Sequence, residues 1–468
     1  MKSNMRKNEN VSSMYENTNE TEFDLLDKFK DLIVEHNLRT GSNIPTEYTI
    51  DLSESQTKAF EQFKKGGPML ILGSAGSGKS KLIKEFYKYI QKQNKKTIYL
   101  TSTTGISAYN IGGITINSFM GIGTAEAPVE LLLKRIRSKI GIRNRIKLTD
   151  VLVIDEISMM SASTFEKINI ICQTLRKSNK PFGGIQIVLT GDMLQLETIF
   201  NNENIDRRLI IESELFIKMF NDSTVILKEN FRQKNDNLYI DLLLRIRENK
   251  YTVEDIQKLQ SRLIKKDQSD IIHLVSSNKK AQAINIEELN KISSEDVNYE
   301  SVYSHFGDKE TCDILVKELK TQFTQKGIET VRLRKGCRVL LIKNLDVSIG
   351  LVNGSVGTVE DLMEDSVKVK FDNGVTETIN RVEWELEIDN TKVSCTQIPL
   401  MLAYSITIHK SQSLSLDKAV LDLADCFCNH MVYVALSRIR SLEGVYLKSF
   451  NHKKITVNKK LLEYIMTF

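Results

Sequence analysis

The stretch GSAGSGKS, from Gly73 to Ser80, directly follows the apolar run PMLIL. It matches the pattern G-x-x-x-x-G-K-[ST] at every fixed position, with Gly73, Gly78, Lys79 and Ser80. The apolar run predicts a buried strand, and the KLIKEFYKYIQK that follows predicts a helix with one apolar face. A glycine-rich turn with an incidental lysine is the alternative, but the strand and helix together favour a phosphate-binding loop.

Such a loop binds the phosphates of a nucleotide, because its backbone N–H groups point inward at the start of a helix. We expect ATP, with Lys79 reaching the β- and γ-phosphates and Ser80 holding Mg²⁺. The loop residues predicted to bind the nucleotide are Gly73, Ser74, Ala75, Gly76, Ser77, Gly78, Lys79 and Ser80.

The composition, with 41% hydrophobic and 27% charged residues, is that of an ordinary globular protein. The net charge of +5 permits a polyanionic partner without requiring one. None of the 6 cysteines has C-x-x-C spacing, which predicts a reducing intracellular environment and no zinc or iron–sulfur site. Since no apolar run reaches about 18 residues, we also expect no membrane-spanning segment.

The chain predicts an α/β fold with several domains. Apolar runs alternate with helical patterns over 46–228, which predicts a doubly wound parallel sheet; the runs are PMLIL, KTIYLTS, DVLVIDE, IQIVLTGD and STVILKENF. A second alternating region over 229–468 predicts a second lobe. Short β-patterned runs with Asn-Gly turns predict a small antiparallel barrel inserted near 345–395. For residues 1–45 we expect an N-terminal tail and one extra helix, Phe23–Leu38.

Carboxylates and an amide follow two of the predicted strands, where ligands bind in parallel sheets. Asp155 and Glu156 end the run VLVIDE, and we expect Asp155 to hold Mg²⁺ and Glu156 to activate the attacking water. Gln195 follows the next run, at VLTGDMLQL, where an amide can contact both the γ-phosphate and the water. This set favours hydrolysis of ATP over phosphate transfer to a metabolite.

Together these motifs resemble those of superfamily-one helicases of the B type, and most closely the Pif family, with the phage Dda and RecD-like enzymes as relatives. The resemblance covers about 52–450 and is carried, in order, by LSESQTKAF, GSAGSGKS, TSTTGISAYNIGGITINSF, VLVIDEISM, LTGDMLQL, LKENFRQ, LVNGSVGTV, AYSITIHKSQSLSLD and VYVALSR. It implies two RecA-like lobes, a small wedge inserted in lobe one near 117–148, and an SH3-like barrel inserted in lobe two.

The resemblance also implies an activity, which is ATP-dependent translocation 5′-to-3′ on single-stranded DNA with unwinding of a duplex. Single-stranded and forked DNA are the expected partners, together with replication or repair proteins, and a monomer is the expected active form. A translocase that remodels protein–DNA complexes but unwinds weakly is the first alternative. A metabolite kinase is a second alternative, although it needs no second lobe, and RNA in place of DNA is a third.

Residue by residue, the resemblance implies further nucleotide contacts. Gln56 stands where the family reads adenine, unless it is simply a solvated residue at a helix start. Arg232 and Arg438 stand where two arginines of the family reach the γ-phosphate, although each could instead form a plain salt bridge.

The DNA contacts implied by the resemblance fall in two segments. In the first, Thr103, Asn117 and Phe119 stand at positions for hydroxyl, amide and stacking contacts, with a core position as the alternative for Phe119. In the second, His409 and Lys410 lie in TIHKSQS, a block that couples DNA to ATP and that also contains Gln412.

A basic run, KRIRSKIGIRNRIK over Lys134–Lys147, falls in the expected wedge and predicts phosphate contacts or a solvated basic face. The sequence departs from the family at Asn117, Ser413 and Glu197–Thr198, where the family usually has histidine, glycine and two prolines. These departures leave the expected ATP site unchanged and put details of DNA contact and coupling in question.

Overall fold

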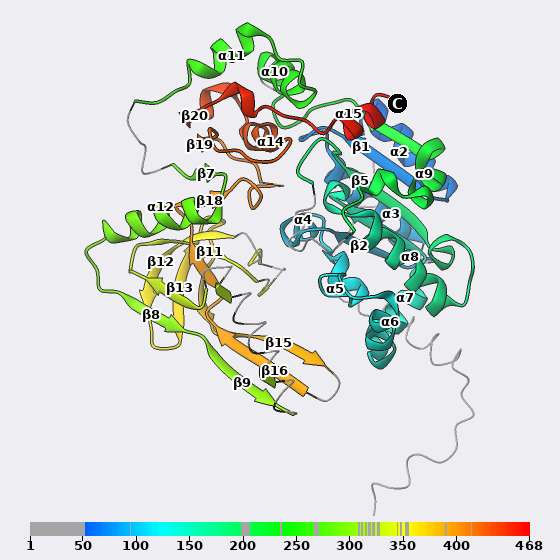
Figure 1. Ribbon diagram of the computed structural model, residues 1–468, viewed down its shortest axis with the longest axis horizontal. Helices are drawn as coiled ribbons and strands as arrows, with labels where there is room; N and C mark the ends of the chain where they lie inside the picture. The colour runs from blue at the N-terminus through cyan, green and yellow to red at the C-terminus, as the bar shows by residue number, and fades with distance from the viewer. Residues whose placement is uncertain are drawn as a thin grey trace, which may run out of the picture.

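The computed structural model describes residues 52–468 except 94, 198–205, 235, 266–270, 308, 310–311, 314–315, 317–319, 321–322, 325–327, 344, 347–348, 352–354, 389–390 and 413 (Figure 1). The helix predicted at Phe23–Leu38 therefore lies outside the described residues. In the described part of the chain, no helix combines the length and apolar character needed to cross a membrane.

The first lobe is built on a six-stranded sheet in the order β3-β2-β4-β5-β1-β6. Every pair in it is parallel, as the sequence predicts. All five apolar runs of this region form strands of the sheet. The strands are β1 (Met69–Gly73), β2 (Ile98–Ser102), β3 (Ile114–Thr115), β4 (Val151–Asp155), β5 (Gln186–Gly191) and β6 (Thr224–Leu227).

Helices cover both faces of this sheet, because successive strand residues point to opposite sides. In β4, Val151 and Val153 pack into one core with helices α2 and α3, whereas Leu152 and Ile154 pack into the other core with α6, α8 and α9. The helices of the lobe are α2 (Glu54–Lys65), α3 (Lys79–Gln93), α4 (Gly105–Asn110), α5 (Ile116–Met120), α6 (Val129–Ser138), α7 (Ile140–Leu148), α8 (Ala162–Arg176) and α9 (Glu214–Phe220).

The second lobe contains a four-stranded parallel sheet in the order β18-β7-β19-β20. Its helix α14 is buried at every position, since it packs between this sheet and the first lobe. The elements are α10 (Asn237–Arg247), α11 (Val253–Gln260), β7 (His273–Val275), α12 (Asn278–Asn290), β18 (Ser405–Thr407), β19 (Ala419–Asp422), α14 (Met431–Ser437) and β20 (Val445–Ser449).

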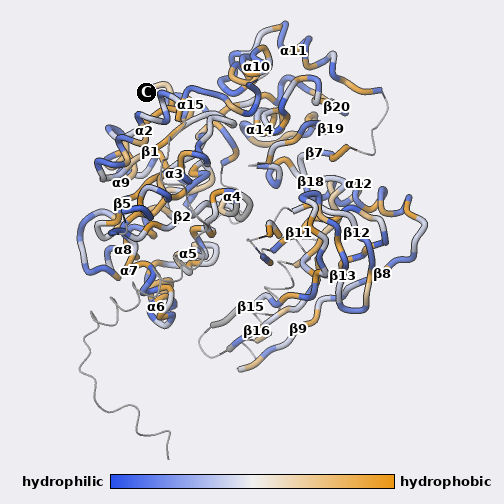
Figure 2. Tube along the Cα trace, turned by 180° about the vertical axis from the view of Figure 1, so that it is seen from behind, coloured by the Kyte–Doolittle hydropathy of each residue, from blue (hydrophilic) through white to orange (hydrophobic). Residues whose placement is uncertain are grey.

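Antiparallel sheets are inserted between α12 and β18 and have their own core. Burial alternates along their strands, for example in β13, and Figure 2 shows the matching alternation of hydropathy. The Asn-Gly signal is confirmed at Gly374, whose φ of 90° closes the turn between β13 and β14. The strands are β8 (Val297–Glu300), β9 (Val302–Phe306), β10 (Thr330–Leu333), β11 (Arg338–Leu341), β12 (Val356–Leu362), β13 (Ser366–Phe371), β14 (Thr376–Asn380), β15 (Val382–Ile388), β16 (Thr391–Gln397) and β17 (Leu400–Leu402).

The last helix, α15 (Lys459–Ile465), returns from the second lobe to pack on the first (Figure 1). Leu461 is buried in the first lobe's core, beside residues of α8 and α9. Lys460 Nζ lies 2.5 Å from a carboxylate oxygen of Glu212. The two lobes are therefore joined by the C-terminal helix as well as by the chain between β6 and α10.

We expect Leu461→Ala to lower the free energy of unfolding of the first lobe by about 2–4 kcal/mol, because it leaves a cavity in a packed core. The matched control is Met466→Ala, at a position 60% exposed, which should cost less than about 0.5 kcal/mol. Differential scanning calorimetry of both variants measures this, and equal transitions would show that α15 does not stabilise the lobe.

Candidate nucleotide site and nucleic-acid surface

The loop between β1 and α3 needs glycine at two positions. Gly76 and Gly78 have φ values of 89° and 82°, in the left-handed region that favours glycine. A Cβ at Gly76 would lie 2.7 Å from Cβ of Arg232, and one at Gly78 would lie 2.4 Å from Nε2 of Gln56. The loop is thus shaped by close contact with two other segments.

Lys79 folds back over the loop that carries it. Its Nζ donates to the carbonyl oxygens of Gly73 at 2.9 Å and Ser74 at 3.1 Å. Burial lowers the pKa of Lys79, while nearby carboxylates, among them Asp192 and Glu156, oppose that shift. The ammonium group is therefore poorly compensated, and an anion above the loop would stabilise its charged form.

A cavity of about 370 Å³ opens above this loop. The first lobe lines it with the loop itself, with Asp155 at the end of β4, with Glu156 just after it, and with Gln195 after β5. The second lobe lines it with Arg438 and Arg440. The sequence prediction that strand ends and distant arginines meet at one site agrees with this arrangement.

Asp155 is buried at the end of β4, and Ser107 Oγ donates to it at 2.9 Å. Burial and the neighbouring Glu156 raise the pKa of Asp155 to about 6. Ser80 lines the same cavity. A hydroxyl and a buried carboxylate are hard oxygen ligands, and a divalent cation would offset the charge that burial penalises, so these residues fit Mg²⁺.

Glu156 has a left-handed backbone, with φ of 54°, which is rare outside glycine and common at functional sites. Its Oε2 accepts a hydrogen bond of 3.3 Å from Nε2 of Gln412, which belongs to the second lobe. The block TIHKSQS therefore contacts the nucleotide site directly through Gln412.

Arg438, which is buried, and Arg232, which is half-buried, both line the cavity. Burial and the charge of Arg438 lower the pKa of Arg232 to about 9. Arg232 donates from Nη1 to the carbonyl of Ser437 at 2.9 Å, and Arg438 donates from Nε to that of Val434 at 2.9 Å. Neither is held by a carboxylate in any contact described, so the plain salt-bridge alternative is not supported for either.

The segment ENFRQ wraps around the phosphate-binding loop and supplies a residue that the sequence analysis missed. Phe231 lines the cavity beside Gly78 and is 47% exposed, so its ring is open to a nucleotide base. Phe231 could have been proposed from the sequence, because it is the aromatic residue next to the predicted Arg232.

Gln56 is fully buried, accepts from the Ser53 N–H at 3.1 Å, and donates to the Ser77 carbonyl at 3.5 Å. The contact of Gln56 with adenine stays a prediction.

A buried network links the loop to both lobes. The Ala75 N–H donates to the Tyr433 hydroxyl at 3.2 Å, and that hydroxyl donates to Asp192 at 3.1 Å. Arg247 of α10 binds the same carboxylate at 2.6 Å. Burial alone would raise the pKa of Asp192, but Arg247 lowers it overall, so the pair is ionised. Gln195 also donates to Asp192, at 3.4 Å, which positions its amide at the cavity.

The residues predicted to contact DNA in the first lobe lie in different environments. Phe119 is fully buried, with its ring 5.1 Å from Tyr99 and 5.0 Å below the Arg145 guanidinium. Its predicted stacking role disagrees with this structure, because the side chain is 0% exposed and packs in the core. Thr103 uses its hydroxyl to donate to the Glu156 carbonyl at 2.8 Å, and Asn117 is half-buried at the start of α5.

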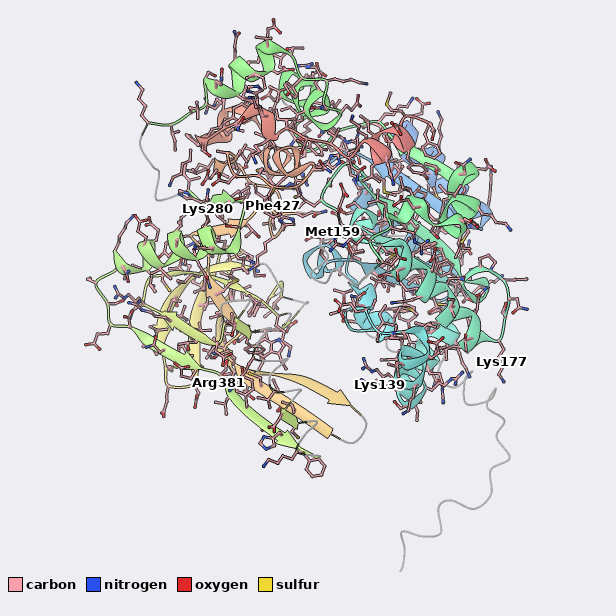
Figure 3. The ribbon with its side chains drawn as sticks, in the orientation of Figure 1. Lys139, Met159, Lys177, Lys280, Arg381 and Phe427 are labelled. Carbon is pink, nitrogen blue, oxygen red and sulfur yellow. The ribbon has the colours of Figure 1, made fainter. Side chains whose placement is uncertain are left out.

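In the second lobe, His409 and Lys410 lie two and three residues after the end of β18. The basic run of the first lobe forms α6 and α7, and its apolar residues pack inward into the core. Arg145 belongs to the run but is occupied by the Ser118 carbonyl, to which it donates at 2.9 Å. The exposed cations of the run are Lys134, Arg135, Arg137 and Lys139. They form a basic surface at the end of lobe one, where Figure 3 shows Lys139.

One departure from the family joins the lobes. Glu197 accepts hydrogen bonds from Nδ2 of Asn429 at 3.5 Å and of Asn458 at 3.0 Å. A proline in its place offers no acceptor on its side chain, so this contact is particular to the present sequence. Of the other departing positions, Asn117 is described above, whereas Thr198 and Ser413 lie outside the described residues.

Comparison with known families agrees with this geometry. A family model described as PIF1-like helicase matches residues 51–258. A second model, described as DNA helicase Pif1, 2B domain, matches residues 319–362, within the antiparallel insertion.

Individual relatives match most of the chain. The ATP-dependent DNA helicase PIF1 of Danio rerio is 32% identical over 418 residues, which cover 88% of this chain and 63% of that protein. The chain thus spans less than two-thirds of that relative. The ATP-dependent DNA helicase Pif1 of Bdellovibrio bacteriovorus is 30% identical over 90% of this chain and 93% of its own length.

Solved structures share this fold. The Pif1 helicase from Candida albicans has a TM-score of 0.79 at 32% identity, with 90% of this chain and 100% of that chain covered. The Pif1 helicase from Bacteroides in complex with ADP-AlF3 and single-stranded DNA has a TM-score of 0.72 at 28% identity, with 90% and 97% covered. The two parallel sheets, the antiparallel insertion and these matches show that the chain belongs to the PIF1-like helicase family.

Proposed function

We propose that this chain is an ATP-dependent DNA helicase that moves 5′-to-3′ on single-stranded DNA and unwinds forked duplex. The observation that carries the proposal is the cavity above the phosphate-binding loop, which residues of both lobes line. A site completed by a second lobe can convert a change in its ligand into movement of that lobe. Relatives described as bound to single-stranded DNA and unwinding forked DNA support the same substrate.

The proposed chemistry assigns a separate task to each group at the cavity. Lys79 would leave the loop carbonyls for the phosphates, and Ser80 with Asp155 would hold Mg²⁺, which neutralises phosphate charge when bound. Glu156 would accept the proton of the attacking water, and Gln195 would orient that water. Arg232 and Arg438 would stabilise the charge that develops on the γ-phosphate.

The proposed domain plan follows the fold. Residues 46–228 form the first RecA-like lobe, with 117–148 as its wedge, and 229–468 form the second RecA-like lobe. The strands β8 to β17 support an insertion of the SH3-like type. It begins at Val297, before residue 345, where the sequence-based prediction placed its start. The helix α15 packs on the first lobe, although its residues fall within the proposed second lobe of 229–468.

The direct test is unwinding of two tailed duplexes. A substrate with only a 5′ single-stranded tail should be unwound in the presence of ATP and Mg²⁺, and one with only a 3′ tail should not. Lys79→Ala is the ATPase-dead control. Unwinding of the 3′-tailed substrate alone would contradict the proposed polarity, whereas DNA-stimulated hydrolysis without unwinding would favour the translocase.

Arg438→Ala tests completion of the site by the second lobe. It should lower kcat for DNA-stimulated hydrolysis by on the order of 10³-fold, with a smaller effect on nucleotide affinity, because the guanidinium acts on charge formed during the reaction. Arg438→Lys keeps a cation and should retain part of the rate.

Arg232→Ala should behave like Arg438→Ala, and the double variant should lose less than the product of the single losses, since the two groups act on one charge. Steady-state kinetics and nucleotide binding measure all four variants. Normal hydrolysis by Arg438→Ala would exclude a site completed by both lobes.

The exposed cations of the basic run should contribute to the salt dependence of single-strand binding. Replacement of Lys134, Arg135, Arg137 and Lys139 by alanine should flatten the slope of log Kd against log salt by up to about 3, because each lost phosphate contact removes roughly 0.7. The matched control replaces Lys177 and Lys180, which are exposed elsewhere on the lobe. Equal slopes for both variants would make the run a solvated face.

A further inference from the structure

The hydroxyl of Ser107 points at the carboxylate that is proposed to hold Mg²⁺. Ser107 belongs to α4, on the side of the first lobe that faces the second (Figure 1), and it is 2% exposed. Its Oγ donates to Oδ2 of Asp155 at 2.9 Å. Thr190 of β5 donates from Oγ1 to the other oxygen, Oδ1. Each oxygen of this carboxylate therefore accepts from a hydroxyl of a different segment.

The backbone that leads to Ser107 is attached to the same strand end. The strands β2 and β4 pair with Ser102 opposite Asp155, and the Thr103 N–H donates to the Asp155 carbonyl at 3.2 Å. The turn into α4 is closed by the Ser107 N–H, which donates to Thr104 Oγ1 at 3.3 Å. Several contacts, and not the hydroxyl alone, thus fix where Ser107 lies relative to Asp155.

The two hydroxyls suit a carboxylate that has to bind a cation. Asp155 is buried beside Glu156, and a buried anion without donors is costly. Lysine or arginine would neutralise the charge, whereas a hydroxyl donates to the carboxylate and leaves its negative charge available to a divalent cation. Asp155 is therefore held in one orientation without being paired.

Of the two hydroxyls, that of Ser107 is the one at the ligand. Ser107 lines the cavity above the phosphate-binding loop, whereas Thr190 is fully buried in the sheet. A serine hydroxyl has one donor and two acceptor lone pairs. Because the donor of Ser107 is directed at Asp155, its lone pairs can accept from a donor in the cavity, such as a water bound to Mg²⁺.

We propose that Ser107 is a positioning residue of the metal site, whose hydroxyl holds the Asp155 carboxylate in the orientation that binds the Mg²⁺ shell. The inference rests on the proposed function, and it adds α4 to the segments that build the nucleotide site. Since Ser107 acts through Asp155, loss of its hydroxyl should weaken binding of the metal and not binding of the nucleotide itself.

The test uses Mn²⁺ in place of Mg²⁺, because free Mn²⁺ is measured directly by electron paramagnetic resonance. Mn²⁺ is titrated into the full chain with ADP kept below the chain's concentration. Ser107→Ala should raise the dissociation constant of Mn²⁺ by about 10-fold, as expected when a metal ligand loses an outer contact. Affinity for ADP in EDTA should change by less than about 2-fold, since the N–H groups of the phosphate-binding loop are unaltered.

The matched control is Ser102→Ala. Ser102 is also buried, and its Oγ also donates to Asp155, but to the backbone carbonyl at 3.2 Å. This variant loses a hydroxyl of the same kind while both donors to the carboxylate remain, so its Mn²⁺ constant should stay within about 2-fold of that of the parent chain.

A second variant tests the carboxylate from its other side. Thr190→Val keeps the branched shape of the side chain but removes the other donor, so it should also weaken Mn²⁺ binding. The double variant of Ser107→Ala and Thr190→Val should lose less than the product of the single losses, because both hydroxyls act on one carboxylate.

The outcomes separate this inference from the proposed function. Mn²⁺ binding by Ser107→Ala that equals or exceeds that of the parent chain would overturn the inference, and so would equal weakening by Ser107→Ala and Ser102→Ala, which points to general loosening of the strand end. Both results leave the helicase proposal in place if the parent chain unwinds 5′-tailed DNA. If the parent chain unwinds neither tailed duplex, the proposed function fails, while the contrast between the two serine variants still decides the role of Ser107.

Discussion

The buried ion pair between Asp192 and Arg247 fixes how the two lobes meet. Asp192 belongs to the first lobe and Arg247 to the second, and both are almost fully removed from solvent. Removal of either partner would leave an unpaired buried charge at this contact, which is strongly destabilising. Tyr433 extends the contact to the Ala75 N–H of the phosphate-binding loop. This network therefore ties the phosphate-binding loop to both lobes beside the cavity.

Two short segments connect that cavity with the loop between β19 and α14, which carries Phe427. Gln412 contacts Glu156, while the imidazole of His409, three residues earlier, stacks on the ring of Phe427. On the other route, Gln195 lines the cavity, and Glu197 binds Asn429 in the loop that carries Phe427. Both routes are thus only a few residues long.

The sequence predicted the parts of the molecule that depend on local patterns. The five apolar runs of the first lobe, the phosphate-binding loop and the polar residues at strand ends are such patterns. The apolar runs form the sheet, and the loop and the polar strand-end residues meet at one cavity. Residues whose environment depends on distant segments were not predictable. Phe119 is buried because Tyr99 and Arg145 cover it, and Leu461 docks on the first lobe although its segment follows the second. Phe231, Tyr433 and Arg247 likewise acquire their roles only from contacts across the fold.

The electrostatics of the cavity explain why it favours a polyanion. Lys79, Arg232 and Arg438 are cations from three segments, and burial lowers the pKa of each. Without a ligand they bind carbonyl and hydroxyl oxygens, which compensate a positive charge only in part. Triphosphate oxygens can replace all of these partners at once. The free energy that such a ligand gains is therefore greatest when groups of both lobes reach it together, and this favours lobe closure over binding to the first lobe alone.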